Sequence, residues 1–213
     1  MIDLLLTLIY SIYFNFRYLK FNVAIKLPIL IHWRTEVHSF SGTLTFINPA
    51  RFCFRIGIGK VGFNRRNDSC VIKNEGDIVV SGSAYIGQGS ELCNSGTLHF
   101  GDGFNISASS RIICINSIKF GANCLVSWGC QIMDCDFHKI YVPNRKIKNP
   151  EIVISDNVWI GNSVYIYKGV KIGEGNIISA NSIIKKGFAN SCCIITSQGG
   201  EVIEISKNVR WEI

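Results

Sequence analysis

An aliphatic residue returns at every sixth position between residues 154 and 184. The six positions are Ile154, Ile160, Ile166, Ile172, Ile178 and Ile184. An amphipathic helix requires spacings of three and four, and a lone strand requires a spacing of two over a short run. A strict period of six instead indicates a three-sided coil of short stacked strands, in which each aliphatic side chain points into a prism-shaped core.

A longer period precedes this one. Equivalent apolar positions recur twenty residues apart, at Val80, Phe100 and Phe120, at Ile86, Ile106 and Val126, and at Leu92, Ile112 and Ile132. Twenty residues make three hexads plus two, so we expect two extra residues at one corner of each of these coils. They form either a repeated bulge, which makes a ridge beside the functional site, or a turn that tolerates two more residues.

The composition fits one globular domain. The chain has 213 residues, of which 47% are hydrophobic and 17% are charged, so a long disordered region is excluded. The net charge of +7 favours an anionic partner. No basic run is dense enough to indicate nucleic acid.

The nine cysteines form no CxxC motif and no regular framework. Cys124 and Cys130 fall at the small inward position of their hexads, so we expect buried thiols in a reducing cytoplasm. Cys130, Cys135 and His138 resemble part of a metal cluster, but a fourth ligand at the usual spacing is missing, and we expect no metal.

Residues 1–20 are apolar and aromatic, with Asp3 as the only charged residue before Arg17. The thirteen uncharged positions between them are fewer than the roughly twenty that span a bilayer. A basic start and a cleavage site of small residues, as in a signal peptide, are both missing. We expect a short helix packed on the end of the coil or between subunits. The alternative is an interfacial contact with the inner membrane.

These patterns divide the chain into three parts. Residues 1–57 are expected to form an apolar helix and an extension that packs on the coil, residues 58–190 the coil, and residues 191–213 a C-terminal strap. Within the coil, residues 139–151 break the period with two prolines and four basic residues. We expect an excursion loop there, and loops on rigid scaffolds commonly carry function.

Three runs in the second half of the chain resemble the hexapeptide-repeat acyltransferases: DNVWIG at 156–161, GVKIG at 169–173 and ANSIIKK at 180–186. The resemblance implies an all-β fold, a left-handed parallel β-helix, a homotrimer and the use of acetyl- or acyl-CoA. The left hand follows from the resemblance alone, because parallel crossovers are otherwise almost always right-handed.

The stretch from Ser127 to His138 resembles the Asp-x-Asp-x-His segment of the family branch that acts on bacterial surface polysaccharides. The resemblance implies that His138 is the general base, a role that suits histidine because its ordinary pKa is about 6.5. Asp134 and Asp136 would share its side of an extended segment. Either could orient the imidazole or bind sugar hydroxyls, and Asp136 could instead occupy a corner. From the residues alone, His138 could be a hydrogen-bonded turn residue.

The same resemblance implies a cofactor site. Asn162 follows Trp159-Ile160-Gly161, where the family contacts the thiol end of CoA and offers a backbone N–H to the oxyanion. Ala180 lies one eighteen-residue coil further on, so it is expected to stack above Asn162 and to extend the pantetheine groove. Trp159 would flank this groove.

Lys185 and Lys186 follow where the family often has a hydroxyl residue and then a lysine. They are positioned to donate charge-assisted hydrogen bonds to phosphate, and the alternative is a solvated turn.

The resemblance favours an enzyme that O-acetylates a sugar hydroxyl in capsule, O-antigen or exopolysaccharide synthesis. Its acceptor would be a saccharide or a lipid- or nucleotide-linked sugar. N-acylation of an amino-sugar nucleotide is an alternative that His138 does not exclude, because an amine also needs a base. A non-catalytic coil scaffold is the third alternative, and the coexistence of His138 with Asn162, Ala180 and Lys186 argues against it.

Overall fold

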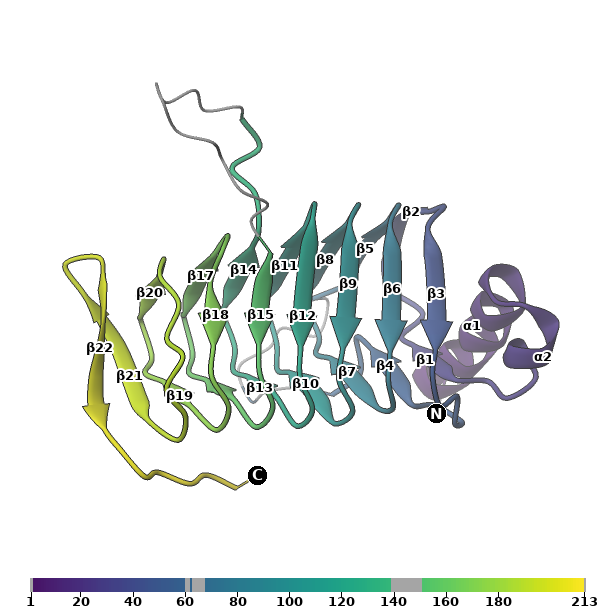
Figure 1. The fold of residues 1–213 in the computed structure, drawn as a ribbon. Coiled ribbons are helices and arrows are strands. Elements are labelled where there is room, and N and C mark those ends of the chain that lie inside the picture. Colours follow the sequence, from purple (N-terminus) through teal and green to yellow (C-terminus); the bar gives the residue numbers. More distant parts are fainter. Residues whose placement is uncertain (1, 60–61, 63–67, 139–150, 213) are drawn as a thin grey trace.

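The computed structural model describes residues 2–59, 62, 68–138 and 151–212. The excursion expected over 139–151 therefore lies, except for Glu151, outside the described residues. The described chain winds as a coil whose strands fall into three sheets, and the winding is left-handed (Figure 1). Neighbouring strands in every sheet are parallel, apart from one antiparallel pair at the C-terminal end. The expected β-helix is confirmed.

Each sheet takes one strand from each coil. Sheet A contains, in spatial order, β1 (Ile29–Ile31), β4 (Phe54–Ile56), β7 (Ala84–Ile86), β10 (Phe104–Ile106), β13 (Leu125–Val126), β16 (Trp159–Ile160), β19 (Ile177–Ile178), β21 (Ile194–Gln198) and β22 (Glu201–Ser206). Sheet B contains β2 (Glu36–Phe40), β5 (Val71–Asn74), β8 (Glu91–Asn94), β11 (Arg111–Cys114), β14 (Gln131–Met133), β17 (Tyr165–Tyr167) and β20 (Ile183–Ile184). Sheet C contains β3 (Thr43–Phe46), β6 (Asp77–Val80), β9 (Thr97–Phe100), β12 (Ser117–Phe120), β15 (Ile152–Ile154) and β18 (Lys171–Ile172).

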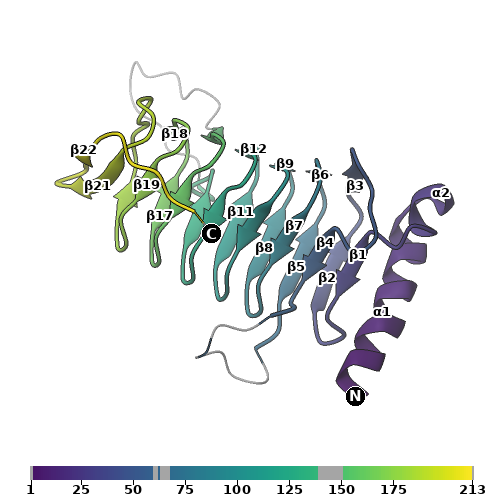
Figure 2. The same ribbon diagram turned by 90° about the horizontal axis from the view of Figure 1, so that it is seen from below.

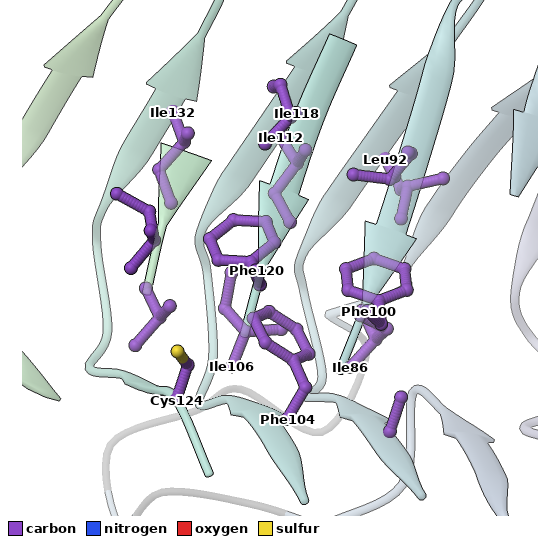
Figure 3. Packing of buried hydrophobic residues seen from close by; sticks show 14 of the residues in the cluster. Ile86, Leu92, Phe100, Phe104, Ile106, Ile112, Ile118, Phe120, Cys124 and Ile132 are labelled. Carbon is purple, nitrogen blue, oxygen red and sulfur yellow. The ribbon is translucent and has the colours of Figure 1, made fainter. Parts of the chain in front are cut away.

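The hexad positions line the core as the period predicts. Ile160, Ile166 and Ile172 are at most 1% exposed, and they come from sheets A, B and C in turn. In the wider coils, aromatic rings fill the prism: Phe104 lies between Phe100 and Phe120, with ring centroids 4.6 Å from each (Figure 3). The inward positions of the middle coils are thus buried between the coils on either side.

The two extra residues of the longer coils do not form a bulge. Strands β5, β8 and β11 pair residue by residue up to their last positions, and so do β6, β9 and β12 on the next sheet. The extra residues therefore lengthen the two strands that meet at the corner between sheets B and C. Asn74 and Asn94 point inward there, each fully buried, and fill the wider corner.

Helix α1 (Ile2–Tyr18) and the short α2 (Phe21–Ala24) cover the N-terminal end of the coil (Figures 1 and 2). The buried face of α1 is largely polar. Ser11 Oγ accepts the N–H of Ile31 at 2.9 Å and donates to its carbonyl oxygen at 3.1 Å, while Asn15 pairs in the same way with both groups of Ile29. The described part of the chain holds no helix long and apolar enough to cross a membrane.

The coil begins earlier than the domain boundary expected at residue 58. Strands β1, β2 and β3 already occupy the three sheets and pair with β4, β5 and β6 of the next coil. The period is hidden here because the connections are irregular, with Pro28 immediately before β1 and Pro49 after β3. The expected extension is therefore largely a first coil.

The C-terminal segment forms both a strand pair and a strap. β21 continues sheet A beside β19, and β22 turns back against it. Residues 207–212 then run along the coil, and Val209 N donates to the carbonyl oxygen of Cys192. This strap ends over sheet A, where Trp211 lies beside Trp159.

The thiols behave as small core residues. Cys124 and Cys130 are 0% and 2% exposed, as their hexad positions predict, and burial raises the pKa of each to about 11. All nine cysteines are free.

Candidate active site

Two columns of residues follow the two edges of sheet B. The first column lies at the corner where sheet A turns into sheet B. Because Val126 pairs with Ile160 and Ile160 with Ile178, Trp128, Asn162 and Ala180 occupy equivalent positions two residues later in successive coils. The expected stacking of Ala180 on Asn162 is therefore what the register produces.

Gly161 allows this corner to be tight. A Cβ atom at position 161 would lie 2.7 Å from the backbone nitrogen of Ala180 and 2.7 Å from the carbonyl oxygen of Ile178. No side chain fits there unless the strands separate, because both atoms belong to the backbone of the next coil.

Three successive backbone N–H groups, those of residues 161–163, lie at this tight corner, and the outer two are hydrogen-bonded to neighbouring coils. Gly161 N donates to Ile178 O at 2.8 Å, and Ser163 N donates to Trp128 O at 3.0 Å. Within the described residues, the intervening N–H of Asn162 makes no backbone hydrogen bond. It is therefore a donor available to a ligand at the surface of the corner.

Trp159 lies on the outer face of sheet A beside this corner. Its Nε1 donates to Ser127 Oγ at 3.1 Å, and its ring centroid is 6.0 Å from that of Trp211. Trp211 Nε1 in turn donates to the carbonyl oxygen of Asn157 at 2.8 Å. The strap thereby covers one side of the tryptophan that we expected to flank the cofactor groove.

The second column lies at the opposite edge of sheet B, where it turns into sheet C. From the strand register, it consists of Asn74, Asn94, Cys114, Asp134, Lys168 and Lys186. Its first four members are fully buried. The column thus changes from buried polar groups in the long coils to lysines in the short ones.

The carboxylate of Asp134 is fully occupied by the backbone. Its Oδ1 accepts the N–H of Ile115 at 2.8 Å, and its Oδ2 accepts those of Asn116 and Ser117 at 2.8 and 2.7 Å. The side chain is 0% exposed. Asp134 therefore holds the corner of the preceding coil together, and its oxygens point into that corner.

Asp136 lies two residues further and is about one-third exposed, with an ion pair to Lys168. Lys168 comes from the next coil and sits directly above Asp134 in the column. The pair anchors the chain where it leaves β14. The structure thus pairs Asp136 with Lys168. The carboxylates of Asp134 and Asp136 consequently point in different directions.

His138 is exposed and is the last described residue before 139–150. The other three histidines have partners. His32 Nε2 lies 3.4 Å from Asp3, His38 Nε2 lies 3.6 Å from Glu36, and His99 Nε2 lies 2.8 Å from Ser81 Oγ. Burial, together with Lys119, lowers the pKa of His99. His138 is therefore an exposed histidine that follows the last residue of β14 by five positions, where the chain leaves the coil.

Lys186 continues the column of Asp134 two coils beyond β14, and Lys185 immediately precedes it. The Lys185 ammonium lies 5.9 Å from the centroid of the Tyr167 ring, and Lys186 forms an ion pair with Glu201 of β22. Ala180 lies at the other end of the short strand β20. The expected cofactor residues thus divide into two groups, one at each edge of sheet B.

The edges of sheet B are far apart within one chain. Lys168 follows Asn162 by six positions, which at about 3.3 Å per residue corresponds to at most roughly 20 Å. Among the residues described, no three histidine, cysteine or acidic side chains gather as a metal site.

Comparison with known proteins identifies the repeats. Residues 151–186 match the family model "Bacterial transferase hexapeptide (six repeats)". The chain is an acyltransferase with the hexapeptide repeats of bacterial transferases. The matched segment covers strands β15 to β20, and the acyltransferase carries both groups of candidate cofactor residues within it or at its edge.

Two curated relatives cover much of the acyltransferase. An uncharacterised 24.8 kDa protein in the cps region of Klebsiella pneumoniae is 28% identical over 92% of this chain and 87% of that protein. WbbJ of Escherichia coli K12, provisionally described as a lipopolysaccharide biosynthesis O-acetyl transferase, is 26% identical over 59% of this chain and 70% of its own.

A solved structure shares the fold. The polySia-specific acetyltransferase NeuO superposes with a TM-score of 0.54 at 19% identity, over 87% of this chain and 79% of NeuO. At this identity the likeness supports the β-helix of the acyltransferase, independently of its substrate.

Three residues at the corners of the acyltransferase were not predicted from the sequence as part of the site. Trp128 stacks below Asn162, Ser127 holds the Trp159 indole, and Lys168 pairs with Asp136. Trp128 follows the core position Val126 by two residues, as Asn162 follows Ile160, so the repeat contained that signal. Lys168 carried none, because its partner lies across the break in the repeat.

Proposed function

We propose that this protein transfers the acetyl group of acetyl-CoA to a hydroxyl of a sugar used in bacterial surface-polysaccharide synthesis. The observation that carries the proposal is the exposed His138, which follows β14 where the chain leaves sheet B, combined with the available amide of Asn162 at the opposite edge of this sheet. The match of residues 151–186 to the bacterial transferase hexapeptide repeats supports the reaction, and the provisional description of WbbJ supports the same substrate class.

In the proposed reaction, His138 removes the proton of the acceptor hydroxyl as its oxygen attacks the thioester carbonyl. The carbonyl oxygen becomes an oxyanion, which the N–H of Asn162 stabilises by a hydrogen bond. The intermediate then collapses, the carbon–sulfur bond breaks, and the thiolate of CoA takes up the proton from His138. The products are the O-acetyl sugar and CoA.

The cofactor is proposed to lie along Ala180, with its phosphates toward Lys185 and Lys186 and with Trp159 and Gly161 bounding the corner. Lys186 would exchange Glu201 for a phosphate, since both partners are anionic and the pair is exposed. Asp136 fixes the chain before His138 through Lys168, and we assign Asp134 a structural role because its oxygens are occupied.

The separation of the two edges supports a homotrimer. If sheet B faces a threefold axis, the edge of one subunit that carries Asn162 meets the neighbour's edge that carries His138. Repeating one such heterologous contact closes a ring. The outer face of sheet B favours this arrangement, because Met133 and Tyr167 are half-buried there and Tyr165 and Ile183 are 39% and 45% exposed.

Placing charge on this face is expected to dissociate the trimer. In the Tyr165→Glu/Ile183→Glu variant, like charges meet around the axis, which costs several kcal/mol and weakens association by about a hundredfold or more. Sedimentation equilibrium at micromolar concentration measures the mass, and Val153→Glu on the outer face of sheet C is the matched control. A wild-type monomer with full activity contradicts the trimer.

Removing Lys186 is expected to weaken cofactor binding. Lys186→Ala should raise the KM for acetyl-CoA about tenfold, which corresponds to about 1.4 kcal/mol, with a smaller change in kcat. Lys207→Ala is the control, because Lys207 is also exposed and also pairs with an acidic residue of β22. Equal KM values for the two variants would remove Lys186 from the site.

Release of free thiol from acetyl-CoA tests the reaction itself. We expect turnover with sugars that offer only hydroxyl groups. Turnover confined to amino sugars would overturn O-acetylation, and absence of turnover with every sugar class at saturating acetyl-CoA would count against the enzyme.

A further inference from the structure

The N-terminal helix is packed the opposite way from a usual surface helix. Thr7, Ser11 and Asn15 form its buried stripe, together with Phe14. The polar stripe is explained by β1, whose free peptide groups it satisfies. Phe14 packs on the coil together with the partly buried Tyr10 and Tyr18. Most of the other large apolar side chains of the helix consequently point outward.

Most of the outward side chains recur at helical spacing along one side of α1, and Phe21 of α2 lies beside Phe16, with ring centroids 6.1 Å apart. Ten of the eighteen large hydrophobic side chains that are exposed in the described chain belong to residues 2–25: Ile2, Leu4, Leu5, Leu6, Ile9, Ile12, Tyr13, Phe16, Phe21 and Ile25. We call this set the N-terminal apolar face. Isolated exposed hydrophobic residues are ordinary, but a gathered set of this size indicates a binding surface.

Basic residues border this face. Arg17, Lys20 and Lys26 are exposed, and the only acidic residue among positions 2–26 is Asp3. The carboxylate of Asp3 accepts a hydrogen bond from Trp33 Nε1 at 2.6 Å and lies beside His32, so it pairs with those side chains. The face therefore combines aliphatic and aromatic groups with cations, which is the chemistry that anionic lipid headgroups and the acyl chains below them accommodate.

We propose that the N-terminal apolar face docks the protein on an anionic lipid surface, with α1 lying in the plane of the interface. The helix does not span the bilayer. It lies at one end of the coil rather than on its side (Figures 1 and 2). In the trimer that we propose, three such faces point to the same end, and joint contact multiplies their affinity. The edges of sheet B then stand perpendicular to the membrane.

This inference locates the acceptor. A sugar carried on a lipid would reach the edge of sheet B from the membrane side, and this part of the argument rests on the proposed function. Docking itself requires only the N-terminal apolar face. An experiment can therefore contradict the docking proposal without contradicting the proposed function, and the reverse also holds.

Co-sedimentation of the full chain with vesicles tests docking. We expect binding to phosphatidylcholine vesicles that contain phosphatidylglycerol, weaker binding to phosphatidylcholine alone, and a decrease with added salt, because the basic residues are solvent-exposed. The Leu5→Ser/Ile9→Ser/Phe16→Ser variant should lose about tenfold or more of the partition coefficient. These side chains are 57%, 56% and 47% exposed, so the core is unchanged.

The control is Ile47→Ser/Ile205→Ser, which removes comparably exposed side chains, 57% and 59%, from β-strand connections and β22. It should bind vesicles as the wild type does. The triple variant should keep its thermal midpoint and its release of thiol from acetyl-CoA with a water-borne sugar, which separates docking from catalysis.

Two outcomes would overturn the proposal. One is equal binding of the wild type and the triple variant to anionic vesicles. The other is a wild-type protein that does not bind vesicles. Sedimentation without lipid then shows whether a second copy of the chain covers the face. If it does, the triple variant has half the mass of the wild type.

Discussion

Replacing His138 with alanine is expected to lower kcat for acetyl transfer by about 10²–10⁴, the range typical for loss of a general base. The affinity for CoA should remain nearly unchanged, because the cofactor is proposed to lie against Asn162, Ala180 and Lys186. The folded state should be unaffected, since His138 is exposed and follows the last strand residue of its coil by five positions. Steady-state kinetics and calorimetric titration with CoA measure the two effects.

His38→Ala is the matched control, since His38 is also exposed and lies on β2, six strands of sheet B away from β20. It should keep the wild-type kcat. Retention of more than about a tenth of kcat by His138→Ala falls short of the smallest general-base effect and would remove His138 from the chemistry.

Replacing Asp134 with alanine is expected to destabilise the coil. The substitution leaves three backbone N–H groups, those of residues 115–117, without their acceptor. Each unsatisfied group costs about 1–3 kcal/mol where water does not reach it. Since these groups are only partly buried, we expect a total of about 2–4 kcal/mol and a thermal midpoint lower by about 5–10 °C.

Asp134→Asn should be much milder, because Asn74 and Asn94 occupy the same column in earlier coils and are equally buried. An amide oxygen at position 134 still accepts the N–H groups of Asn116 and Ser117, so only the N–H of Ile115 loses its acceptor. Differential scanning calorimetry compares both variants with the wild type. An Asp134→Ala variant with an unchanged midpoint but a loss of kcat would instead make this carboxylate the group that orients His138.

The core was predictable because burial is tied to the period. Once Ile154, Ile160 and Ile166 are placed on successive sides of a coil, the register of every neighbouring strand follows, and so does the stacking of Ala180 on Asn162. The same period places the buried Cys124 and Cys130. Inward positions need no information beyond their spacing.

The relation between Asp134, Asp136 and His138 was not predictable in this way. Alternation would place all three on one side only if the strand continued, but β14 ends at Met133. Beyond that point the carboxylate of Asp134 turns to the backbone of the previous coil and Asp136 turns to Lys168 of the next. Contacts between coils across a break in the repeat leave no pattern in the sequence.

The orientation of α1 also required the structure. Its apolar residues predict a face buried against the coil, whereas the free peptide groups of β1 bind Ser11 and Asn15 instead. Hydrogen-bond demand at the first strand therefore decided which face of the helix turns inward.

The polar stripe of α1 has a consequence for how long the molecule can be. A stack of parallel coils presents at each end a rung of peptide groups that another stack can continue, so open ends invite growth into a filament. At the first coil, the side chains of Ser11 and Asn15 form hydrogen bonds with the N–H and C=O groups of Ile29 and Ile31, as a neighbouring strand would. At the last coil, Ser197 Oγ takes the N–H of Ile183 at 2.7 Å. Hydroxyl and amide side chains thus occupy peptide groups of sheet A at the first coil, and a hydroxyl occupies one of sheet B at the last, where another stack would otherwise pair.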